Sequence, residues 1–259
     1  MGIINVTPDS FYDGGKTTVL RDIIAQAEKM VAHGATFLDI GGYSSRPGAK
    51  DVSETEELER VIPVIEALAK EFPGTFLSVD TFRSTIAKEA VGAGAALVND
   101  ISGGMLDEDM ISTVAKLKVP YILMHMKGTP KTMNSFAEYK NVTKEILYYF
   151  SERIALARKA GINDIIADPG FGFAKTREQN FEILNHLELF KALGVPLLAG
   201  ISRKSLIYKT LETSPEKALN GTTVLNTIAL QKGANMLRVH DVKETKECVA
   251  LLQSVINTD

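Results

Sequence analysis

The chain repeats one kind of junction four times: a glycine ends a segment with helical periodicity, and a short apolar run follows almost at once. The junctions are His33-Gly34-Ala35, Ala93-Gly94-Ala95, Ala160-Gly161-Ile162 and Lys232-Gly233-Ala234. A glycine at this position supplies the left-handed cap that ends a helix before the chain enters a strand. Its recurrence predicts a series of strand–helix units.

Eight strand–helix units can be followed along the 259 residues, and no change of composition divides them. Strands that alternate with helices pair in parallel through right-handed crossovers. Eight such units are typical of a (β/α)8 TIM barrel, which predicts an α/β fold with a single domain over residues 1–259. A doubly wound open sheet is the alternative. Met1 lies only two residues before the apolar Ile3, so we expect the first strand to be truncated.

The composition argues against several classes of protein. Hydrophobic residues make up 45% of the chain, and the net charge of −3 disfavours a nucleic acid as partner. The lone Cys248 cannot form an internal disulfide, and the four histidines lack the spacing of a zinc site. No signal peptide or membrane-spanning run is visible in the sequence, so we expect a cytoplasmic protein that does not bind a membrane.

Polar residues stand where nearly every predicted strand ends. Asp168 closes the apolar run 165–167 and is followed by Pro169 and Gly170, which stop the strand. In a (β/α)8 barrel, the strand ends and the loops after them carry function. Polar side chains cost desolvation free energy there unless they are paired. The other residues at such positions are Asn5, Asp39, Asp80, Asn99, His125, Ser202, Lys204, Arg238 and His240.

The polar strand ends fall into two chemical groups. One group offers carboxylates and an amide: Asp80, Asn99 and Asp168. A buried carboxylate can accept two N–H bonds from the edge of a flat heterocycle, each worth about 1.5–3 kcal/mol. The other group is cationic and comes from the last two units, where barrels commonly bind phosphate: Lys204, Arg238 and His240. The pattern predicts a small heterocyclic substrate with an anionic tail.

Seven segments extend this pattern over nearly the whole chain. They are residues 5–11 (NVTPDSF), 45–48 (SRPG), 78–81 (SVDT), 99–104 (NDISGG), 168–173 (DPGFGF), 202–205 (SRKS) and 238–241 (RVHD). As an ordered set, they resemble the dihydropteroate synthase family of pterin-binding enzymes. The resemblance implies a folate-pathway transferase with a (β/α)8 barrel.

The resemblance also implies roles for individual residues. For the pterin, the implied contacts are Asp80, Asn99, Met124, Asp168, Lys204 and Arg238. For p-aminobenzoate, they are Ser45, Arg46, Pro47, Phe173, Lys204 and Ser205. For pyrophosphate, they are Asn5, Arg238 and His240, with Asn5 as a ligand of Mg²⁺. The implied catalytic residues are Asp80, Lys204, Arg238 and His240. Phe11 and Asp13 are expected to assist from the first loop.

The implied reaction joins 6-hydroxymethyl-7,8-dihydropterin pyrophosphate to p-aminobenzoate, giving 7,8-dihydropteroate and pyrophosphate. The resemblance favours an SN1-like displacement assisted by Mg²⁺, inhibition by sulfonamides, and a homodimer. Two alternatives remain on the sequence alone: a pterin-binding methyltransferase domain of the corrinoid-dependent type, and a non-catalytic pterin-binding relative. Arg46, Lys204, Arg238 and His240 weigh against the methyltransferase domain, which needs neither a pyrophosphate site nor an aminobenzoate pocket.

Overall fold

The repeated glycine junctions lie at helix ends, as the sequence predicts. In the computed structural model, which describes residues 1–6, 16–44 and 51–257, the four junction glycines all have positive φ. Their φ values run from +89° at Gly34 to +119° at Gly94, a backbone region that residues with a β-carbon rarely adopt. Each glycine therefore turns the chain out of a helix and toward the next strand.

The described residues form eight short strands, whose order follows the chain. The strands are β1 (Gly2–Asn5), β2 (Phe37–Gly41), β3 (Phe76–Asp80), β4 (Leu97–Asp100), β5 (Tyr121–Met124), β6 (Ile165–Asp168), β7 (Leu198–Ala199) and β8 (Met236–Leu237). The α-helices are α1 (Lys16–Ala32), α2 (Glu54–Glu71), α3 (Ser84–Gly92), α4 (Met110–Leu117), α5 (Val142–Ala160), α6 (Arg177–Asn185), α7 (Ser205–Tyr208), α8 (Leu219–Gln231) and α9 (Val242–Ile256). Short 3₁₀ helices add η2 (Met133–Phe136), η3 (Leu187–Leu193) and η4 (Pro215–Lys217).

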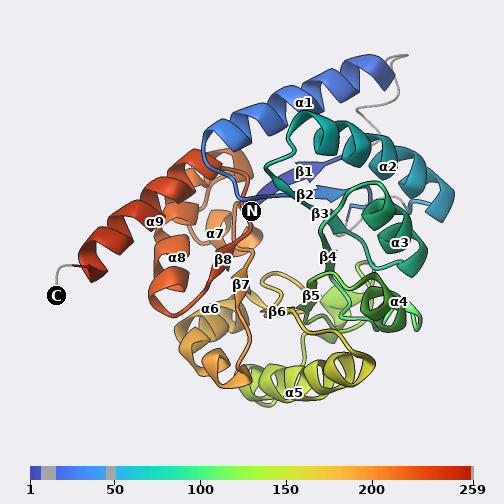
Figure 1. Cartoon of the computed structure of the whole chain (residues 1–259). Helices are drawn as coiled ribbons and strands as arrows, with labels where there is room; N and C mark the ends of the chain where they lie inside the picture. Colours follow the sequence, from blue (N-terminus) through green and yellow to red (C-terminus); the bar gives the residue numbers. More distant parts are fainter. Residues whose placement is uncertain (7–15, 45–50, 258–259) are drawn as a thin grey trace.

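The strands follow one another around a ring (Figure 1). Strands β1 to β6 form one parallel sheet, and β7 pairs in parallel with β8. Single parallel bridges connect the two sheets, from Ala167 to Leu197 on one side and from Gly2 to Val239 on the other. Because parallel strands all point the same way, their carboxyl ends meet at one rim of the ring.

The register of the sheet aligns several predicted site residues on that rim. Asn5 at the end of β1 pairs with Gly41, Gly41 pairs with Asp80, and Asp80 pairs with Asn99. Farther along the sheet, Met124 pairs with Asp168. The polar groups at these strand ends therefore have another polar group, a glycine or a methionine beside them.

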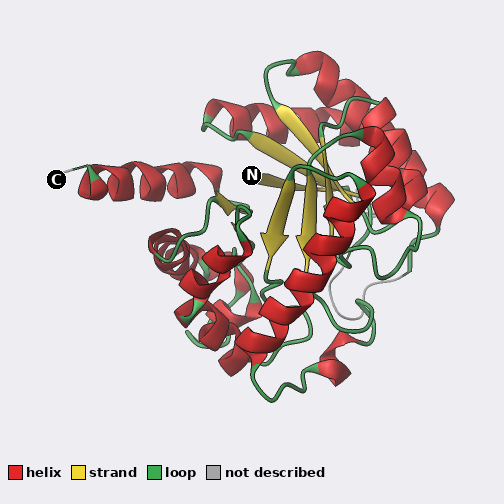
Figure 2. Cartoon of the chain, turned by 60° about the horizontal axis from the view of Figure 1, so that its bottom comes forward, coloured by secondary structure: helices red, strands yellow, loops and turns green. Residues whose placement is uncertain are grey.

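Apolar side chains fill both sides of the strands. Inside the ring, Leu97, Ile122 and Leu198 form a cluster with side chains from β6 and β8. A larger cluster lies between the strands and the surrounding helices, which Figure 2 shows as an outer layer. Burying one Leu or Ile side chain contributes about 1.5–3 kcal/mol, so these layers hold the rim in place. Among the described residues, no helix is long and apolar enough to cross a membrane.

The sequence predicts one helix over residues 177–193, but the structure divides this segment in two. The α-helix α6 ends at Asn185, and residues Leu187–Leu193 continue as the 3₁₀ helix η3. Apolar side chains at every third position suit the three-residue turn of a 3₁₀ helix, and here Leu187 and Phe190 are both buried. The tighter turn lets both side chains reach the core.

Candidate functional site

Arg238, directly after β8, joins carboxylates from β2 and β3, beyond the neighbouring strand β1. Its Nε lies 2.5 Å from Asp39 Oδ2, and its Nη2 lies 2.5 Å from Asp80 Oδ2. Asp39 Oδ2 also accepts a hydrogen bond of 3.0 Å from Asn99 Nδ2. One guanidinium group therefore links the ends of β3 and β8 to Asp39, which lies within β2 and not at its end, where the sequence predicts it, with β4 connected through Asn99.

Charge and burial act against each other in this cluster. Desolvation lowers the pKa of Arg238, but the charges of Asp39 and Asp80 outweigh it and hold the pKa above its ordinary value. Burial raises the pKa of Asp80, while the charge of Arg238 opposes that shift. Asp39 is fully buried, and its Oδ1 has no hydrogen-bond partner among the described residues. The cluster depends on Arg238 for charge balance.

Asp168 ends β6 and is held by the turn that follows it. Its Oδ1 accepts a hydrogen bond of 2.8 Å from the backbone N–H of Gly170. A β-carbon at Gly170 would lie 2.1 Å from the His125 carbonyl oxygen, so only glycine fits there. Desolvation raises the pKa of Asp168, and Lys204 is the first of the positive charges that oppose the shift.

Lys204 precedes α7 and reaches across to the loop after β6. Its Nζ donates a hydrogen bond of 2.5 Å to the Phe171 carbonyl and lies 4.8 Å from the centre of the Phe173 ring. Desolvation lowers the pKa of Lys204 to about 8, against the opposing charge of Asp168. The amine thus lies between the carboxylate of Asp168 and an aromatic face.

Gly200, after β7, marks the point where these side chains meet. A β-carbon added there would lie 3.7 Å from Lys204 Nζ, 3.8 Å from Asp168 Oδ2 and 3.9 Å from Arg238 Cβ. A carboxylate, an amine and the base of an arginine therefore surround one small space at the rim. This arrangement can bind a ligand that presents N–H donors on one edge and negative charge on another.

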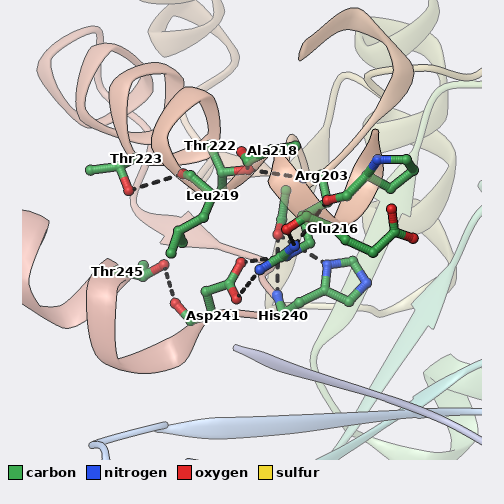
Figure 3. Close-up of polar contacts among 11 residues, drawn as sticks. Arg203, Glu216, Ala218, Leu219, Thr222, Thr223, His240, Asp241 and Thr245 are labelled. Atoms are coloured by element: carbon green, nitrogen blue, oxygen red, sulfur yellow. Dashed lines mark hydrogen bonds and ion pairs between the residues drawn. The ribbon is translucent and has the colours of Figure 1, made fainter. Parts of the chain in front are cut away.

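His240 lies beside Ser202, which belongs to the loop after β7. The Ser202 hydroxyl lies 3.0 Å from His240 Nδ1, and it also accepts a hydrogen bond of 3.2 Å from the His240 backbone N–H. Neighbouring Arg203 binds both carboxylate oxygens of Asp241 at 2.8 Å (Figure 3). It also donates to the carbonyls of Pro215 and Glu216. Arg203 thereby fixes the loop after β7 to the start of α9.

An apolar cluster lies at the rim beside β5 and β6. Met124 is buried in it with Ile101, Met126, Met133 and Ala174, and the Phe173 ring packs against it. Ser205 is the first residue of α7, directly after Lys204. Flat apolar rings pack well against such methionine-rich surfaces, because the thioether side chains adapt to irregular shapes.

A magnesium ion is implied by the resemblance, and the predicted ligand is Asn5. This residue is exposed at the end of β1, where its amide oxygen can reach a bound ion. Within residues 1–6, 16–44 and 51–257, no group of three or more His, Cys, Asp or Glu side chains could hold a metal. Mg²⁺ commonly uses few protein oxygens together with phosphate oxygens of the substrate, so a single amide ligand fits this ion.

The structure brings most predicted site residues to one rim. Direct contacts or shared surroundings join Asp80, Asn99, Asp168, Phe173, Lys204 and Arg238. Met124 pairs with Asp168 in the sheet, and its cluster packs against Phe173. Ser205 follows Lys204 at the start of α7, His240 lies beside Ser202, and Asn5 ends β1. Ser45, Arg46, Pro47, Phe11 and Asp13 lie outside the described residues.

Sequence reasoning missed Lys175, although it ends the loop that begins at Asp168. Its Nζ lies 3.1 Å from His125 Nδ1 and 2.9 Å from the carbonyls of Gly170 and Phe173. The available signal was the position of a lysine just beyond a Pro-Gly turn. Nothing in the spacing alone indicates that this side chain folds back into the loop.

Comparison with known proteins shows which family the chain resembles. Residues 1–240 match the model of the pterin binding enzyme family. A dihydropteroate synthase from Synechocystis sp. is 47% identical over 246 residues, which covers 94% of this chain and 85% of that protein. The matches do not favour a methyltransferase domain or a non-catalytic relative.

Solved structures give the same result. Dihydropteroate synthase from Xanthomonas albilineans, solved with 4-aminobenzoic acid, superposes with a TM-score of 0.92 at 42% identity, covering 100% of this chain and 93% of that one. The Yersinia pestis enzyme, solved as a sulfonamide drug complex, gives a TM-score of 0.93 at 42% identity, covering 100% and 94%. Both structures support the predicted TIM barrel. The chain therefore belongs to the pterin-binding enzyme family, among the dihydropteroate synthases.

Proposed function

We propose that this protein joins 6-hydroxymethyl-7,8-dihydropterin pyrophosphate to p-aminobenzoate, forming 7,8-dihydropteroate and pyrophosphate. The observation that carries the proposal is the convergence of Asp168, Lys204 and Arg238 around Gly200. A carboxylate acceptor and an amine beside Gly200, with the guanidinium group of Arg238 extending from there to Asp39 and Asp80, match a ring edge with N–H donors and an adjoining anionic group.

In this proposal, the carboxylate of Asp168 accepts the N–H donors of the pterin ring edge. Its Oδ1 is already held by Gly170, and its Oδ2 faces the space beside Gly200. Asn99 and Asp80 complete the polar contacts on the neighbouring strands, and Met124 packs against the ring. Only an ionised Asp168 can accept two such bonds, so pterin affinity depends on keeping this acid deprotonated.

The cationic half binds the pyrophosphate in the same proposal. Arg238 and His240 neutralise its charge, and Asn5 contributes an amide oxygen to a Mg²⁺ ion. When bound, Mg²⁺ would add further positive charge at the phosphate oxygens. Arg238 is paired with Asp39 and Asp80, so a pyrophosphate must compete with these carboxylates for the guanidinium group.

The reaction proceeds by departure of pyrophosphate before attack. The C–O bond of the pterin methylene breaks, and its electron pair leaves with the pyrophosphate. The remaining cation is delocalised into the pterin ring. The negative charge of Asp80, at the end of β3, stabilises this cation. The amine nitrogen of p-aminobenzoate then forms the C–N bond and loses a proton. No covalent enzyme intermediate is needed.

The second substrate is proposed to lie on the Phe173 side of Lys204. The amine of Lys204 over the Phe173 ring forms one wall, and Ser205 offers a hydroxyl at the start of α7. Ser45, Arg46 and Pro47 are proposed to complete this pocket, and Phe11 and Asp13 to assist from the first loop. Sulfonamides, which resemble p-aminobenzoate, are expected to compete for it.

Three further properties belong to the proposal. We infer a single domain, because all eight strands contribute to one ring. A homodimer and a cytoplasmic location rest on the resemblance and the composition.

The test is a direct assay of the purified chain with the dihydropterin pyrophosphate, p-aminobenzoate and Mg²⁺. We expect dihydropteroate and pyrophosphate in equal amounts, and loss of product when the metal is chelated. A Lys232→Met variant is a matched control, because Lys232 binds Asn185 and Glu188 away from the strand ends. A folded wild-type protein that forms no dihydropteroate would refute the proposed function.

A further inference from the structure

The loop after β6 closes around the amine of Lys175. Nζ lies 2.9 Å from the carbonyl oxygens of Gly170 and Phe173, 3.3 Å from that of His125, and 3.1 Å from His125 Nδ1. Four acceptors surround a group with at most three protons. Because carbonyls can only accept hydrogen bonds, this arrangement stabilises an ammonium ion.

The backbone of the loop is shaped so that its carbonyls reach this amine. Gly170, Gly172 and Ala174 have φ values of +72°, +82° and +48°, so every second residue is left-handed. Ala174 carries a β-carbon and is therefore strained in this conformation. The bonds from Lys175 to the carbonyls of Gly170 and Phe173 hold the curled segment together from inside.

Lys175 also belongs to a series of side-chain contacts that connects three strand ends. The His125 ring meets the Tyr149 ring edge to face, with centroids 4.8 Å apart. The Tyr149 hydroxyl donates hydrogen bonds of 3.0 Å to the Met124 carbonyl and 3.2 Å to the Ser102 carbonyl. The ends of β4, β5 and β6 are thus connected through Tyr149, His125 and Lys175.

His125 remains neutral in this network. Desolvation, followed by the charges of Lys175 and Lys127, lowers its pKa to about 2. Its Nδ1 therefore accepts a hydrogen bond from the Lys175 amine, and its own proton is on Nε2. In the hydrogen bond between the two side chains, Lys175 is therefore the donor.

The segment held by Lys175 is the one that contacts both proposed pockets. The Gly170 N–H binds Asp168 at 2.8 Å, and the Phe171 carbonyl accepts the bond from Lys204 at 2.5 Å. The Phe173 ring lies under Lys204. A shift of this segment would therefore move groups on the pterin side and on the aminobenzoate side together.

We propose that Lys175 is a positioning residue for both substrate pockets: its ammonium group fixes the segment from Gly170 to Phe173 and adds to the positive charges of Lys204 and Arg238 that act on the carboxylate of Asp168. The proposal rests on the proposed function, in which Asp168 binds the pterin. Lys175 touches neither reacting atoms nor substrate in this account. It acts through the backbone of its own loop and through the electrostatic potential at Asp168.

Several charged groups face this pair, and they set the direction of the pH effect. Asp168 faces the positive charges of Lys204, Arg238 and Lys175. Lys175 faces Asp168, Lys204 and Lys127, and desolvation lowers its pKa well below the ordinary value, with Asp168 opposing the shift. Removing the Lys175 charge must raise the pKa of Asp168 further. As the pH falls, Asp168 would then become protonated, and pterin binding would be lost, at a higher pH than in the wild type.

The experiment compares Lys175→Met and Lys175→Gln with the wild type. Calorimetry measures the affinity for 6-hydroxymethyl-7,8-dihydropterin and for p-aminobenzoate between pH 5 and pH 9, and thermal melting confirms folding. We expect Lys175→Met to bind the dihydropterin at least tenfold more weakly at neutral pH. The acid midpoint of binding should move upward. Glutamine keeps two N–H donors without the charge, so Lys175→Gln should lose less affinity but show the same upward shift.

Lys232→Met is the matched control, because it also removes a lysine that binds a backbone carbonyl. It should leave affinity and midpoint unchanged. A folded Lys175→Gln protein with the wild-type acid midpoint would overturn the electrostatic role. Wild-type affinities in both Lys175 variants would overturn the proposal entirely. If the wild type itself binds no dihydropterin, the proposed function is wrong, and the role of Lys175 fails with it.

Discussion

The two halves of the rim are built by different means. The carboxylates and the amide come from strands of the six-stranded sheet, where each strand has four or five residues. The cationic groups follow β7 and β8, which have two residues each. In the first half, the backbone register positions the side chains. In the second half, bonds between side chains do so, such as Ser202 with His240 and Arg203 with Asp241.

One rim thus combines hydrogen-bond acceptors that the sheet register positions with cationic groups that side-chain contacts position. Arg238 belongs to the second half by sequence but pairs with Asp39 and Asp80 of the first. A buried ion pair contributes little net stability by itself, but removing one partner leaves the other charge uncompensated. Arg238 is therefore the residue at which the two halves are most strongly coupled.

The largest expected effect follows from breaking that coupling. Arg238→Met leaves Asp39 and Asp80 buried without their counter-charge, so unfolding by urea should show a loss of about 3–5 kcal/mol. Dihydropteroate formation should be abolished. Adding Asp39→Asn to Arg238→Met should restore part of the stability, because one uncompensated charge disappears. Wild-type stability in Arg238→Met would show that the halves are not coupled in this way.

A smaller effect is expected in the sheet-positioned half. Gly170→Ala places a β-carbon 2.1 Å from the His125 carbonyl at a φ of +72°. The left-handed conformation and the clash together should destabilise the fold by about 2–3 kcal/mol. Dihydropterin affinity should fall with it, because Gly170 binds Asp168.

Gly161→Ala is the matched control for this change. Gly161 has a φ of +101°, but an added β-carbon there meets no atom within 4 Å. Only the conformational cost of about 1–2 kcal/mol should remain, with pterin affinity unchanged. Equal effects on pterin binding from both substitutions would argue against the close packing of Gly170 on His125.

The smallest of these stability effects is expected in the cationic half. Arg203→Met removes two bonds to Asp241 and two to the carbonyls of Pro215 and Glu216. Because Arg203 and Asp241 are partly exposed, the loss should be about 1–2 kcal/mol. Affinity for inorganic pyrophosphate should weaken, because the loop with Ser202, which contacts His240, is then no longer bonded to Asp241 at the start of α9.

The control for this substitution is Arg177→Met, which removes an exposed pair with Glu178. Exposed ion pairs contribute about 0–1 kcal/mol, so this variant should be close to the wild type in both measurements. If Arg203→Met leaves pyrophosphate affinity unchanged, side-chain bonds do not position the cationic half.

The sequence was sufficient to predict the strand ends, because the apolar runs and the glycine junctions are local patterns. Asp80, Asn99 and Asp168 were therefore placed on the correct strands. The pairing of Arg238 with Asp39 joins residues 199 positions apart, and only the closure of the ring brings them together. The helix predicted over 177–193 was wrong because buried side chains at every third position favour a 3₁₀ turn after Asn185.

The contacts of Lys175 depend on backbone torsions that residue types do not specify. Gly170 and Gly172 permit positive φ, but Ala174 does not favour it, and only the folded loop shows all three curled together. The predicted roles of Ser45, Arg46, Pro47, Phe11 and Asp13 stay predictions, since these residues lie outside the described part of the chain.

The division of the rim is tested most directly by Asp168→Asn, which keeps the shape of the side chain and removes its charge. Calorimetry should compare the binding of 6-hydroxymethyl-7,8-dihydropterin with the binding of inorganic pyrophosphate in the presence of Mg²⁺. We predict at least tenfold weaker binding of the dihydropterin, with pyrophosphate affinity changed less than twofold. Unaltered dihydropterin binding, or an equal loss for both ligands, would contradict the account.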